Sequence, residues 1–254
     1  MAFDYTNYTP VEYIGVGSTT GPYIKTDIHP YYGIAEMEVE YQAINTGAYQ
    51  SIMGCRAANS LIVVPLYSRN SALGAGFKGK WNDGMFSYAI DTRYSVKTQI
   101  SASADEQPYM EVNGVKVDMT GTYSAMSASS YYFDIFAYNS ESSGGNTHQY
   151  YAANVKLYDL KWSDLSDNLL YHFVPCISKD PTPVPGLYEV VNEKFFANRG
   201  SGSFIYGSPI VTGSNVWLKD AGTWKQANTV YIKDAGVWKA ATNVYIKDSG
   251  SWKS

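Results

Sequence analysis

Short strand-length segments separated by turns are the feature that most constrains the fold of this chain. Apolar segments of strand length recur about every 8–15 residues through most of the sequence, and almost no stretch shows a helical period. In Ile34–Tyr41, apolar residues alternate with Glu36, Glu38 and Glu40, which is typical of a half-buried strand. Asn113-Gly114 is the clearest hairpin signal. This pattern predicts an all-β chain of antiparallel strands in two sheets, which is either a sandwich or a jelly roll.

The central region of the chain combines two apolar segments with a proline-rich bend and a hairpin. Val155–Trp162 has apolar residues on both faces, which predicts a strand in the middle of a sheet. Leu169–Val174 is predicted to be a second strand that ends at Pro175. A further hairpin is predicted around Asn192-Glu193, although that turn lacks the glycine that hairpins favour.

Several motifs of this chain occur together in one known group of proteins. They are VEYI from Val11, GPYIKTDIHP from Gly21, KLYD from Lys156, FVPC from Phe173, GLYEVVNEKF from Gly186 and GSGSF from Gly200. In these motifs the chain resembles the concanavalin A-like jelly rolls of the laminin G-like group, which are found in phage structural proteins and bacterial surface proteins. Asp27 stands where glycine is usual in the group, and there is an insertion around residues 15–17. The resemblance implies one jelly-roll domain over about residues 11–207.

The chain is therefore predicted to divide into four parts. Residues 1–10 form an N-terminal arm whose first residues we expect to be loose. Residues 11–207 form the jelly roll, in which Tyr131–Tyr138 is expected to be one long aromatic strand. Residues 208–215 form a linker, and residues 216–254 form a small module of β-hairpin repeats.

Three copies of a 14-residue unit make up this C-terminal module. They read VWLKDAGTWK from Val216, VYIKDAGVWK from Val230 and VYIKDSGSWK from Val244. Each copy is predicted to be a hairpin with a three-residue loop. That loop would bring an aliphatic residue opposite a tryptophan in each hairpin: Leu218 with Trp224, Ile232 with Trp238 and Ile246 with Trp252. One such hairpin cannot bury its apolar face alone, so we expect the hairpins to pack together or against partners.

The repeats also resemble short repeats at the ends of phage structural proteins. Phage fibre-type proteins are commonly trimers, so the resemblance implies a homo-oligomer, with a trimer favoured. It further implies that other virion proteins are partners of this chain.

Charge and hydropathy argue against several classes of partner. The net charge is −4 and the pI is about 5.4, whereas a nucleic-acid-binding protein would show a basic face. No apolar run approaches the roughly 20 residues of a membrane-spanning helix, so no membrane insertion is expected. The first residues lack the basic and apolar regions of a signal peptide. These features fit a virion surface protein made in the host cytoplasm, and they fit a recombinant fragment equally well.

Glu36, Glu38 and Glu40 form the one constellation that resembles a catalytic site. Alternate residues of a strand share a face, so these carboxylates lie in a row. Jelly-roll glucanases carry a similar strand, E-x-D-x-E, whose outer glutamates act as nucleophile and acid/base. That likeness would give these roles to Glu36 and Glu40. Here the middle residue is glutamate instead of aspartate, and the motif lies too early in the chain, so a structural strand and no enzyme activity are predicted.

No metal or other cofactor is predicted. Three histidines are scattered without a metal-ligand spacing: His29, His148 and His172. Four aspartates could ligate calcium, as in some laminin G-like domains, but they form no dense cluster: Asp83, Asp91, Asp118 and Asp134.

Other motifs lead to structural expectations. Gly74-x-Gly76 is not followed by a helix, which argues against a phosphate-binding loop. Cys55 and Cys176 are predicted to be buried thiols in preference to a disulfide.

Exposed aromatic residues beside polar ones are the candidates for ligand binding, because a sugar offers both C–H faces and hydroxyl groups. Tyrosine is abundant, with 24 residues, and it suits half-buried strands as well as sugar-binding surfaces. The best candidates are Trp81 with Asp83 on one loop and Tyr138 with Asn139 at the start of another. For each pair, packing at a strand edge or turn chemistry is the alternative.

Three functions remain open at this point. The favoured one is a non-enzymatic phage virion protein of the fibre or receptor-binding type, which displays a jelly roll for attachment to host surface glycans. The second is a glycan hydrolase that uses Glu36 and Glu40. The third is a purely structural decoration protein of the virion that binds no ligand.

Overall fold

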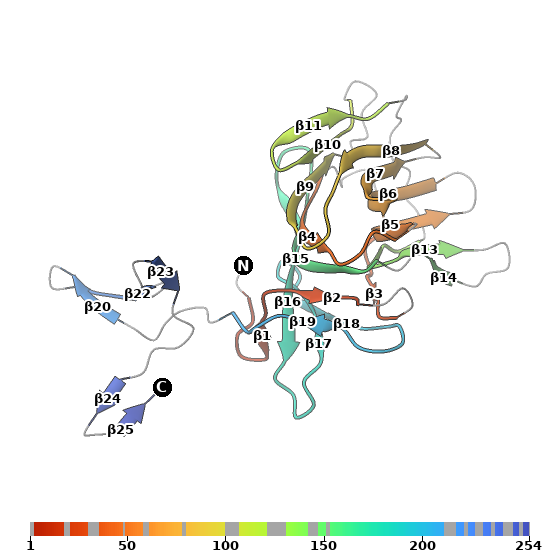
Figure 1. Ribbon diagram of the computed structural model, residues 1–254. Coiled ribbons are helices and arrows are strands. Elements are labelled where there is room, and N and C mark those ends of the chain that lie inside the picture. The colour runs from red at the N-terminus through yellow and green to blue at the C-terminus, as the bar shows by residue number, and fades with distance from the viewer. Residues whose placement is uncertain are drawn as a thin grey trace. The chain divides into compact units, whose positions relative to one another are not determined.

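The computed structural model divides the chain into two compact units, residues 1–208 and residues 209–254 (Figure 1). In the first unit and the two residues after it, the structure describes residues 3–17, 21–29, 36–47, 49–57, 61–77, 80–99, 107–120, 131–141, 147–150 and 153–210. In the rest of the second unit it describes the backbone of residues 217–220, 223–226, 231–234, 237–240, 246–248 and 251–253. Across these ranges, no helix is long and apolar enough to span a membrane.

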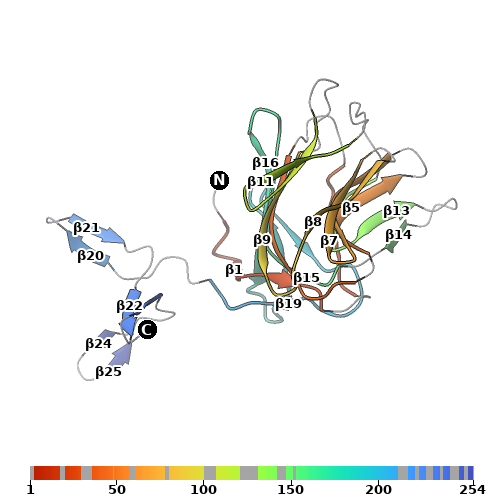
Figure 2. The same ribbon diagram turned by 45° about the horizontal axis from the view of Figure 1, so that its top comes forward.

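Two β-sheets stacked face to face make up the first unit (Figure 2). The first sheet contains β1 (Tyr8–Pro10), β2 (Ile14–Gly15), β4 (Glu36–Ala43), β9 (Arg93–Gln99), β10 (Tyr109–Val112), β11 (Val115–Asp118), β15 (Val155–Ser163), β16 (Leu169–Ser178), β17 (Pro185–Glu189), β18 (Lys194–Ala197) and β19 (Ile205–Tyr206). The second contains β3 (Ile24–Lys25), β5 (Gln50–Ala57), β6 (Leu61–Arg69), β7 (Ala72–Phe77), β8 (Lys80–Ser87), β12 (Asp134–Ile135), β13 (Tyr138–Glu141) and β14 (Thr147–Tyr150).

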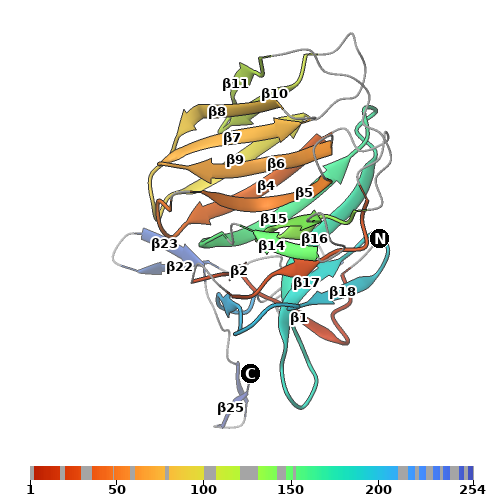
Figure 3. The same cartoon turned by 90° about the vertical axis from the view of Figure 1, so that its right-hand side faces the viewer.

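The strand order of the first sheet is β11-β10-β9-β4-β15-β16-β17-β18, with β1 beside β16, β2 beside β15 and β19 beside β2. The order of the second sheet is β14-β13-β5-β6-β7-β8, with β12 beside β5 and β3 beside β12. Figure 3 looks onto the second sheet, with strands of the first sheet behind it. Among the described strands, every pair is antiparallel except β13 with β5.

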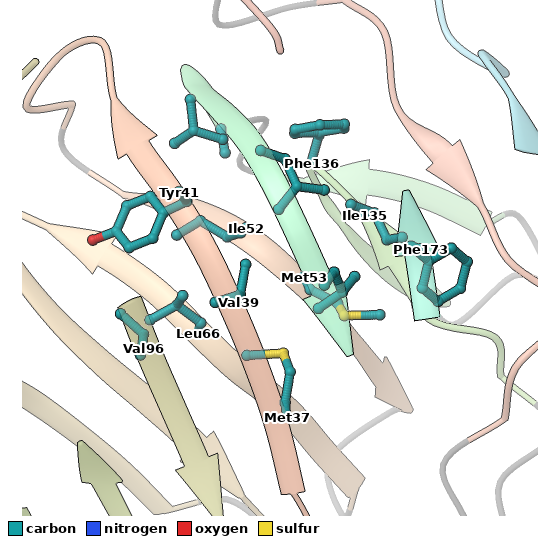
Figure 4. Packing of buried hydrophobic residues seen from close by; sticks show 14 of the residues in the cluster. Met37, Val39, Tyr41, Ile52, Met53, Leu66, Val96, Ile135, Phe136 and Phe173 are labelled. Carbon is teal, nitrogen blue, oxygen red and sulfur yellow. The ribbon is translucent and has the colours of Figure 1, made fainter. Parts of the chain in front are cut away.

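The core lies between the two sheets and takes side chains from both (Figure 4). Met37, Val39 and Tyr41 of β4 point into it, which confirms the alternation predicted for this segment. The Trp162 ring of β15 is fully buried and meets Phe133 edge-on, with 4.5 Å between ring centroids. Because edge-on aromatic pairs add to the energy of apolar burial, this contact stabilises the stacking of the sheets.

Strand β15 lies in the middle of the first sheet, as the sequence predicted. It pairs with β4 over its whole length, and on its other edge with β2 and then β16. The predicted end of the next strand at Pro175 is wrong, because β16 continues through it to Ser178. Pro175 lies where the neighbour of β16 changes from β15 to β1, so no ladder hydrogen bond depends on its missing N–H.

The predicted long strand Tyr131–Tyr138 is also wrong, because the chain reverses direction within it. Strand β12 pairs antiparallel with β5, whereas β13 pairs parallel with the same strand. Between them Phe136 has a φ of 68°, which is uncommon for a bulky residue. Its backbone N–H donates to the Ile52 carbonyl at 2.7 Å, and its buried ring packs against Phe204 at 5.3 Å. These contacts hold the reversal.

The N-terminal arm is packed onto the fold from Phe3 onward, which corrects the expectation of a loose arm for these residues. Phe3 and Tyr8 cover the outer face of the first sheet, where they contact Tyr188 at 5.2 and 5.0 Å between ring centroids. Tyr8 also stacks on Phe195 at 4.9 Å. Cys176 lies buried in the same cluster with a free thiol, whose pKa burial raises to about 12. Cys55, in the main core, is likewise free and buried, as predicted.

Both predicted hairpins are present, and their turns are stabilised in different ways. Asn113 and Gly114 have φ values of 50° and 84°, as a tight hairpin turn requires. The turn between β17 and β18 has Glu193 at φ 56°, where glycine is usual. Glu189, only 1% exposed, stabilises this turn by accepting hydrogen bonds from the backbone N–H groups of Val191 and Asn192, both at 2.8 Å. It also accepts bonds from the Asn192 side chain and from a neighbouring backbone N–H of β16.

The second unit contains three two-stranded hairpins, β20–β21 (Trp217–Asp220, Thr223–Gln226), β22–β23 (Tyr231–Asp234, Val237–Ala240) and β24–β25 (Ile246–Asp248, Ser251–Lys253). The predicted register is wrong by one residue. Trp224 pairs with Lys219, Trp238 with Lys233 and Trp252 with Lys247. Only two residues separate the paired ends of each hairpin, and a slip of one residue exchanges the faces of a strand. The side chains of these hairpins lie outside the described residues.

Replacement of Glu189 by glutamine tests its role in the turn. The variant keeps the size of the side chain but loses the charge that four N–H groups surround. We expect the free energy of unfolding to fall by about 2–3 kcal/mol, since hydrogen bonds to charged groups are the stronger class. Urea denaturation followed by circular dichroism measures this loss. Glu193→Gln, an exposed change in the same turn, is the matched control, and equal losses in both variants would contradict the assignment.

Candidate functional site

Three aromatic side chains gather on the outer face of the second sheet. Tyr49 and Tyr67 stack with ring centroids 4.9 Å apart and planes 13° apart. Trp81 of β8 stands edge-on to both, at 5.9 Å from Tyr49 and 5.3 Å from Tyr67. We call these three residues the aromatic platform. Together with Val64 and Tyr138, the two tyrosines form an apolar cluster separate from the main core.

Glycines of β7 form the floor on which the aromatic platform lies. A Cβ atom on Gly74 would be 2.6 Å from the Tyr67 ring, and one on Gly76 would be 2.6 Å from the Trp81 indole. The neighbouring residues Leu73 and Ala75 point to the opposite face, into the core. The alternation of small and apolar residues along this strand therefore lets the rings lie directly against the sheet.

Polar groups border the aromatic platform. The Tyr67 hydroxyl donates a hydrogen bond of 2.6 Å to Asp83, and Arg69 lies 3.5 Å from the other oxygen of the same carboxylate. The side chains of Arg69 and Asp83 are 54% and 51% exposed. Burial and the hydrogen bond to Asp83 both raise the pKa of Tyr67, so its hydroxyl remains a donor at neutral pH. Trp81 is 38% exposed. The surface thus presents an aromatic ring beside an accessible carboxylate and guanidinium.

The two predicted ligand-binding pairs have different surroundings in the structure. Trp81 and Asp83 are exposed and lie near each other, but on strand β8 instead of a loop. The expected exposure of Tyr138 and Asn139 is wrong, because they are 4% and 2% exposed. Tyr138 packs beside Tyr67, and Asn139 donates a hydrogen bond to a backbone carbonyl. The structure therefore places Tyr138 within the apolar cluster beside the platform, where its ring is buried.

The sequence reading missed Tyr49, Tyr67 and Arg69. Tyrosine is abundant along the chain, with 24 residues, so these two carried no signal of their own. The available signal was Gly74-x-Gly76, since glycine at alternate positions of a strand leaves one face open to close contact. Its meaning depends on which strands are neighbours, and this is a property of the fold.

The glutamate side chains of β4 lie on the outer face of the first sheet, and each of them forms an ion pair with a basic residue of β9. Lys97 contacts Glu36 at 2.6 Å and Glu38 at 3.0 Å, and Arg93 forms an ion pair with Glu40. Burial lowers the pKa of Lys97, but the hydrogen bonds and charges of the two glutamates raise it above its ordinary value overall. All three predicted acidic residues are thus part of a charged cross-strand network.

A hydroxyl donor completes this network at Glu36. Tyr109 donates to the Glu36 carboxylate at 3.1 Å. Burial, followed by the charge of Glu36, raises the pKa of Tyr109 to about 12. The hydroxyl therefore remains protonated at neutral pH.

The described residues contain no group of three or more histidine, cysteine, aspartate or glutamate side chains that could hold a metal ion. His172 lies 2.7 Å from Asp159 on the first sheet, and His29 packs against Tyr132. The side chain of His148 lies outside the described residues. Burial raises the pKa of Asp159, but hydrogen bonds from His172 and Lys161 outweigh it, so this pKa is below its ordinary value.

No protein-family model matches the sequence, and neither does any curated protein sequence. Among solved structures, a Bacteroides ovatus protein to which carbohydrate binding is ascribed matches with a TM-score of 0.54 and 13% identity, over 80% of this chain and 62% of that chain. The heptameric SAP-like pentraxin of Limulus polyphemus matches with a TM-score of 0.44 and 14% identity, over 73% of this chain and 97% of the pentraxin.

The first unit is a jelly-roll sandwich. The fold predicted from the sequence is therefore confirmed. At 13% identity the likeness to the Bacteroides protein concerns the fold alone, and this chain spans less than two thirds of that protein's length.

Substitution of Gly76 by alanine tests the contact between the platform and its floor. The added methyl group would lie 2.6 Å from the Trp81 indole and must displace it. We expect a loss of about 1–3 kcal/mol in the free energy of unfolding, together with a change in the near-ultraviolet circular dichroism of tryptophan. Gly17→Ala, whose new methyl group would meet only Ile205 at 3.9 Å, is the control. Identical spectra and stability for the Gly76 variant and the unmodified chain would refute this contact.

Proposed function

We propose that the jelly roll is a non-enzymatic carbohydrate-binding domain that holds a saccharide on the aromatic platform. The observation that carries this proposal is the exposed Trp81 ring beside Asp83 and Arg69. The C–H face of a sugar ring packs on an indole, while its hydroxyl groups bond to a carboxylate and a guanidinium at the border. Both kinds of contact are available within one surface.

The rigidity of the platform supports this proposal. The Trp81 ring lies against Gly76 and edge-on to two tyrosines, so it is already ordered before a ligand arrives. A preordered side chain loses little conformational entropy on binding, and more of the contact energy remains as affinity. The carbohydrate binding ascribed to the Bacteroides ovatus protein of similar fold is consistent with this function.

Glycan hydrolysis by Glu36 and Glu40 is the alternative function for the same fold. The ion pairs of these residues with Lys97 and Arg93 favour a structural role. A hydrolase needs one carboxylic acid that can donate a proton to the leaving group. Here Glu36 contacts Lys97 and Glu40 contacts Arg93, so both carboxylates are engaged in cross-strand ion pairs.

The wider setting that we propose is the surface of a phage virion, where the jelly roll attaches to a host glycan. The resemblance of the sequence motifs and of the C-terminal repeats to phage structural proteins motivates this setting. In it, the second unit joins the chain to other copies or to other virion proteins. A purely structural decoration protein is the competing reading, and it predicts that no glycan binds.

Truncation of the Trp81 side chain tests the proposed function. A glycan array first identifies saccharides that bind the full-length chain, and isothermal titration calorimetry then gives their affinities. We expect Trp81→Ala to weaken binding by about tenfold or more, because an aromatic anchor carries much of such an interface. Tyr206→Ala, which removes another exposed aromatic ring, should leave the affinity unchanged.

Two results would contradict the proposal. An array without any bound glycan would favour a structural protein. Release of reducing ends from a bound glycan, abolished by Glu36→Gln, would favour the hydrolase.

Removal of the second unit tests its proposed role in assembly. A two-stranded hairpin is marginal in water, and the described residues of the unit form three such hairpins. We expect the full chain to associate, with a mass by light scattering of three times 28.1 kDa if the trimer is correct. A chain that ends at Ser208 should be a monomer that unfolds cooperatively on heating and keeps a far-ultraviolet circular dichroism spectrum typical of β structure. A monomeric full-length chain that also fails to join virion particles would exclude the assembly role.

A further inference from the structure

Apart from the aromatic platform, the first unit has a recess where the edges of the two sheets approach each other. Strand β18 is at the end of the first sheet, and β3 is at the end of the second sheet next to β12. The two strands are in contact (Figure 1). The recess between them has a volume of about 540 Å³, and we call it the edge hollow. This volume is within the usual range for sites that bind small ligands.

Positive charge predominates in the edge hollow. Its lining includes the cations Lys25, Lys194 and Arg199 and the single carboxylate Asp27, a difference of two positive charges. Lys194 is paired with Asp27. Within the described part of the chain, no carboxylate forms an ion pair with Lys25 or Arg199. The hollow therefore concentrates positive charge in a chain whose net charge is −4.

Aromatic side chains form the walls around these cations. The Tyr132 ring packs against His29 at 4.1 Å between centroids, and the Lys25 ammonium lies 5.5 Å from the centre of the Tyr132 ring. Burial raises the pKa of Tyr23, Asp134 raises it further and Arg199 lowers it, with a net value above the ordinary one. The Tyr23 hydroxyl is therefore protonated at neutral pH and can donate a hydrogen bond into the hollow.

The backbone that carries Arg199 is fixed against strand β3. The Arg199 N–H donates to the Tyr23 carbonyl at 2.9 Å, and the Asn198 side chain accepts bonds from the N–H groups of Tyr23 and Gly200 at 3.2 and 2.8 Å. A Cβ atom on Gly200 would be 2.1 Å from the carbonyl oxygen of Gly21, so only glycine permits this approach. The cationic side chain thus extends from a rigid support.

A smaller recess of about 230 Å³ adjoins the edge hollow. Both recesses are lined by Asp27, Lys194 and Phe196. The ion pair between Lys194 and Asp27 therefore stands on their common border. Because both side chains are half exposed, solvent screens this pair and an incoming anion can compete with Asp27 for the lysine.

We propose that the edge hollow binds an acidic saccharide, one that carries a carboxylate or a sulfate group. The anionic group would lie between Arg199, Lys25 and Lys194, with the sugar ring against Tyr132 and Tyr23. Arg199 supplies a planar guanidinium that matches two oxygens of such a group, and the lysines supply point charges. The choice of a saccharide over another anion rests on the proposed function, whereas the preference for negative charge rests on the hollow itself.

The test compares acidic and neutral oligosaccharides on the full-length chain. Isothermal titration calorimetry is performed with hexasaccharides of hyaluronan, which carries carboxylates, and of chondroitin sulfate, which carries carboxylates and sulfates. Cellohexaose is the neutral probe, and sodium sulfate is the free-anion probe. We expect an acidic hexasaccharide to bind more tightly than the neutral one, with an affinity that falls as salt is raised from 50 to 300 mM.

Single substitutions then locate the binding site. Arg199→Ala and Lys25→Ala should each weaken binding of the acidic hexasaccharide by about tenfold or more, since each removes a charged contact. Lys116→Ala removes an exposed cation on β11, at the opposite end of the first sheet, and should change nothing. In a Trp81→Ala background, Arg199→Ala should still weaken binding of the acidic hexasaccharide by about tenfold, which separates the edge hollow from the aromatic platform. Thermal unfolding of each variant verifies that it is folded.

Three results would overturn the inference. The first is equal affinity of the acidic hexasaccharide for the unmodified chain and for both hollow variants. The second is sulfate alone binding as tightly as the hexasaccharide, which indicates a site for a free ion. The third is the absence of any acidic binding. If neutral glycans still bind in a manner sensitive to Trp81, the proposed function survives this failure, and if they do not, both proposals fail.

Discussion

Burial of one face of each sheet against the other is the interaction on which the first unit depends. The fully buried Trp162 and Phe133 meet in this core, and strand β4 contributes its four inward side chains, those of Met37, Val39, Tyr41 and Ala43. Sheets that pack this way leave their outer faces free to differ. Here the outer face of the first sheet carries a charged network around Lys97, and that of the second sheet carries the aromatic platform. Both candidate surfaces are thus consequences of the same core.

The core could be predicted from the sequence because it depends on a pattern along the chain. Alternation in Ile34–Tyr41 identified the inward residues of β4, and the apolar Val155–Trp162 identified a central strand. Features that depend on neighbours could not be predicted in this way. The reversal at Phe136 depends on strand β5, because β12 pairs antiparallel with β5 and β13 pairs parallel with it. The register of the C-terminal hairpins changed with a single residue of loop length.

The candidate site likewise has residues that the local sequence identifies and residues that only the neighbouring strands bring together. Trp81 and Asp83 could be found because the two residues lie close together in the sequence itself, and the structure exposes both side chains. Tyr138 has the same local character but is buried beside Tyr67, because the outer face of a sheet can bury aromatic rings as well as display them. The edge hollow had no signature at all. Lys25 and Arg199 lie far apart in the chain, and only the meeting of β3 with β18 brings them together.

The packed N-terminal arm has a practical consequence for work with this protein. Phe3 and Tyr8 shield apolar surface on the first sheet, and Tyr8 stacks on Phe195, which also lines the edge hollow. Removal of the first ten residues would therefore expose an apolar patch on the first sheet and remove the ring that stacks on Phe195 at the edge hollow. Affinity tags, fluorescent labels and immobilisation points therefore belong after Ser208, where the first compact unit has already ended.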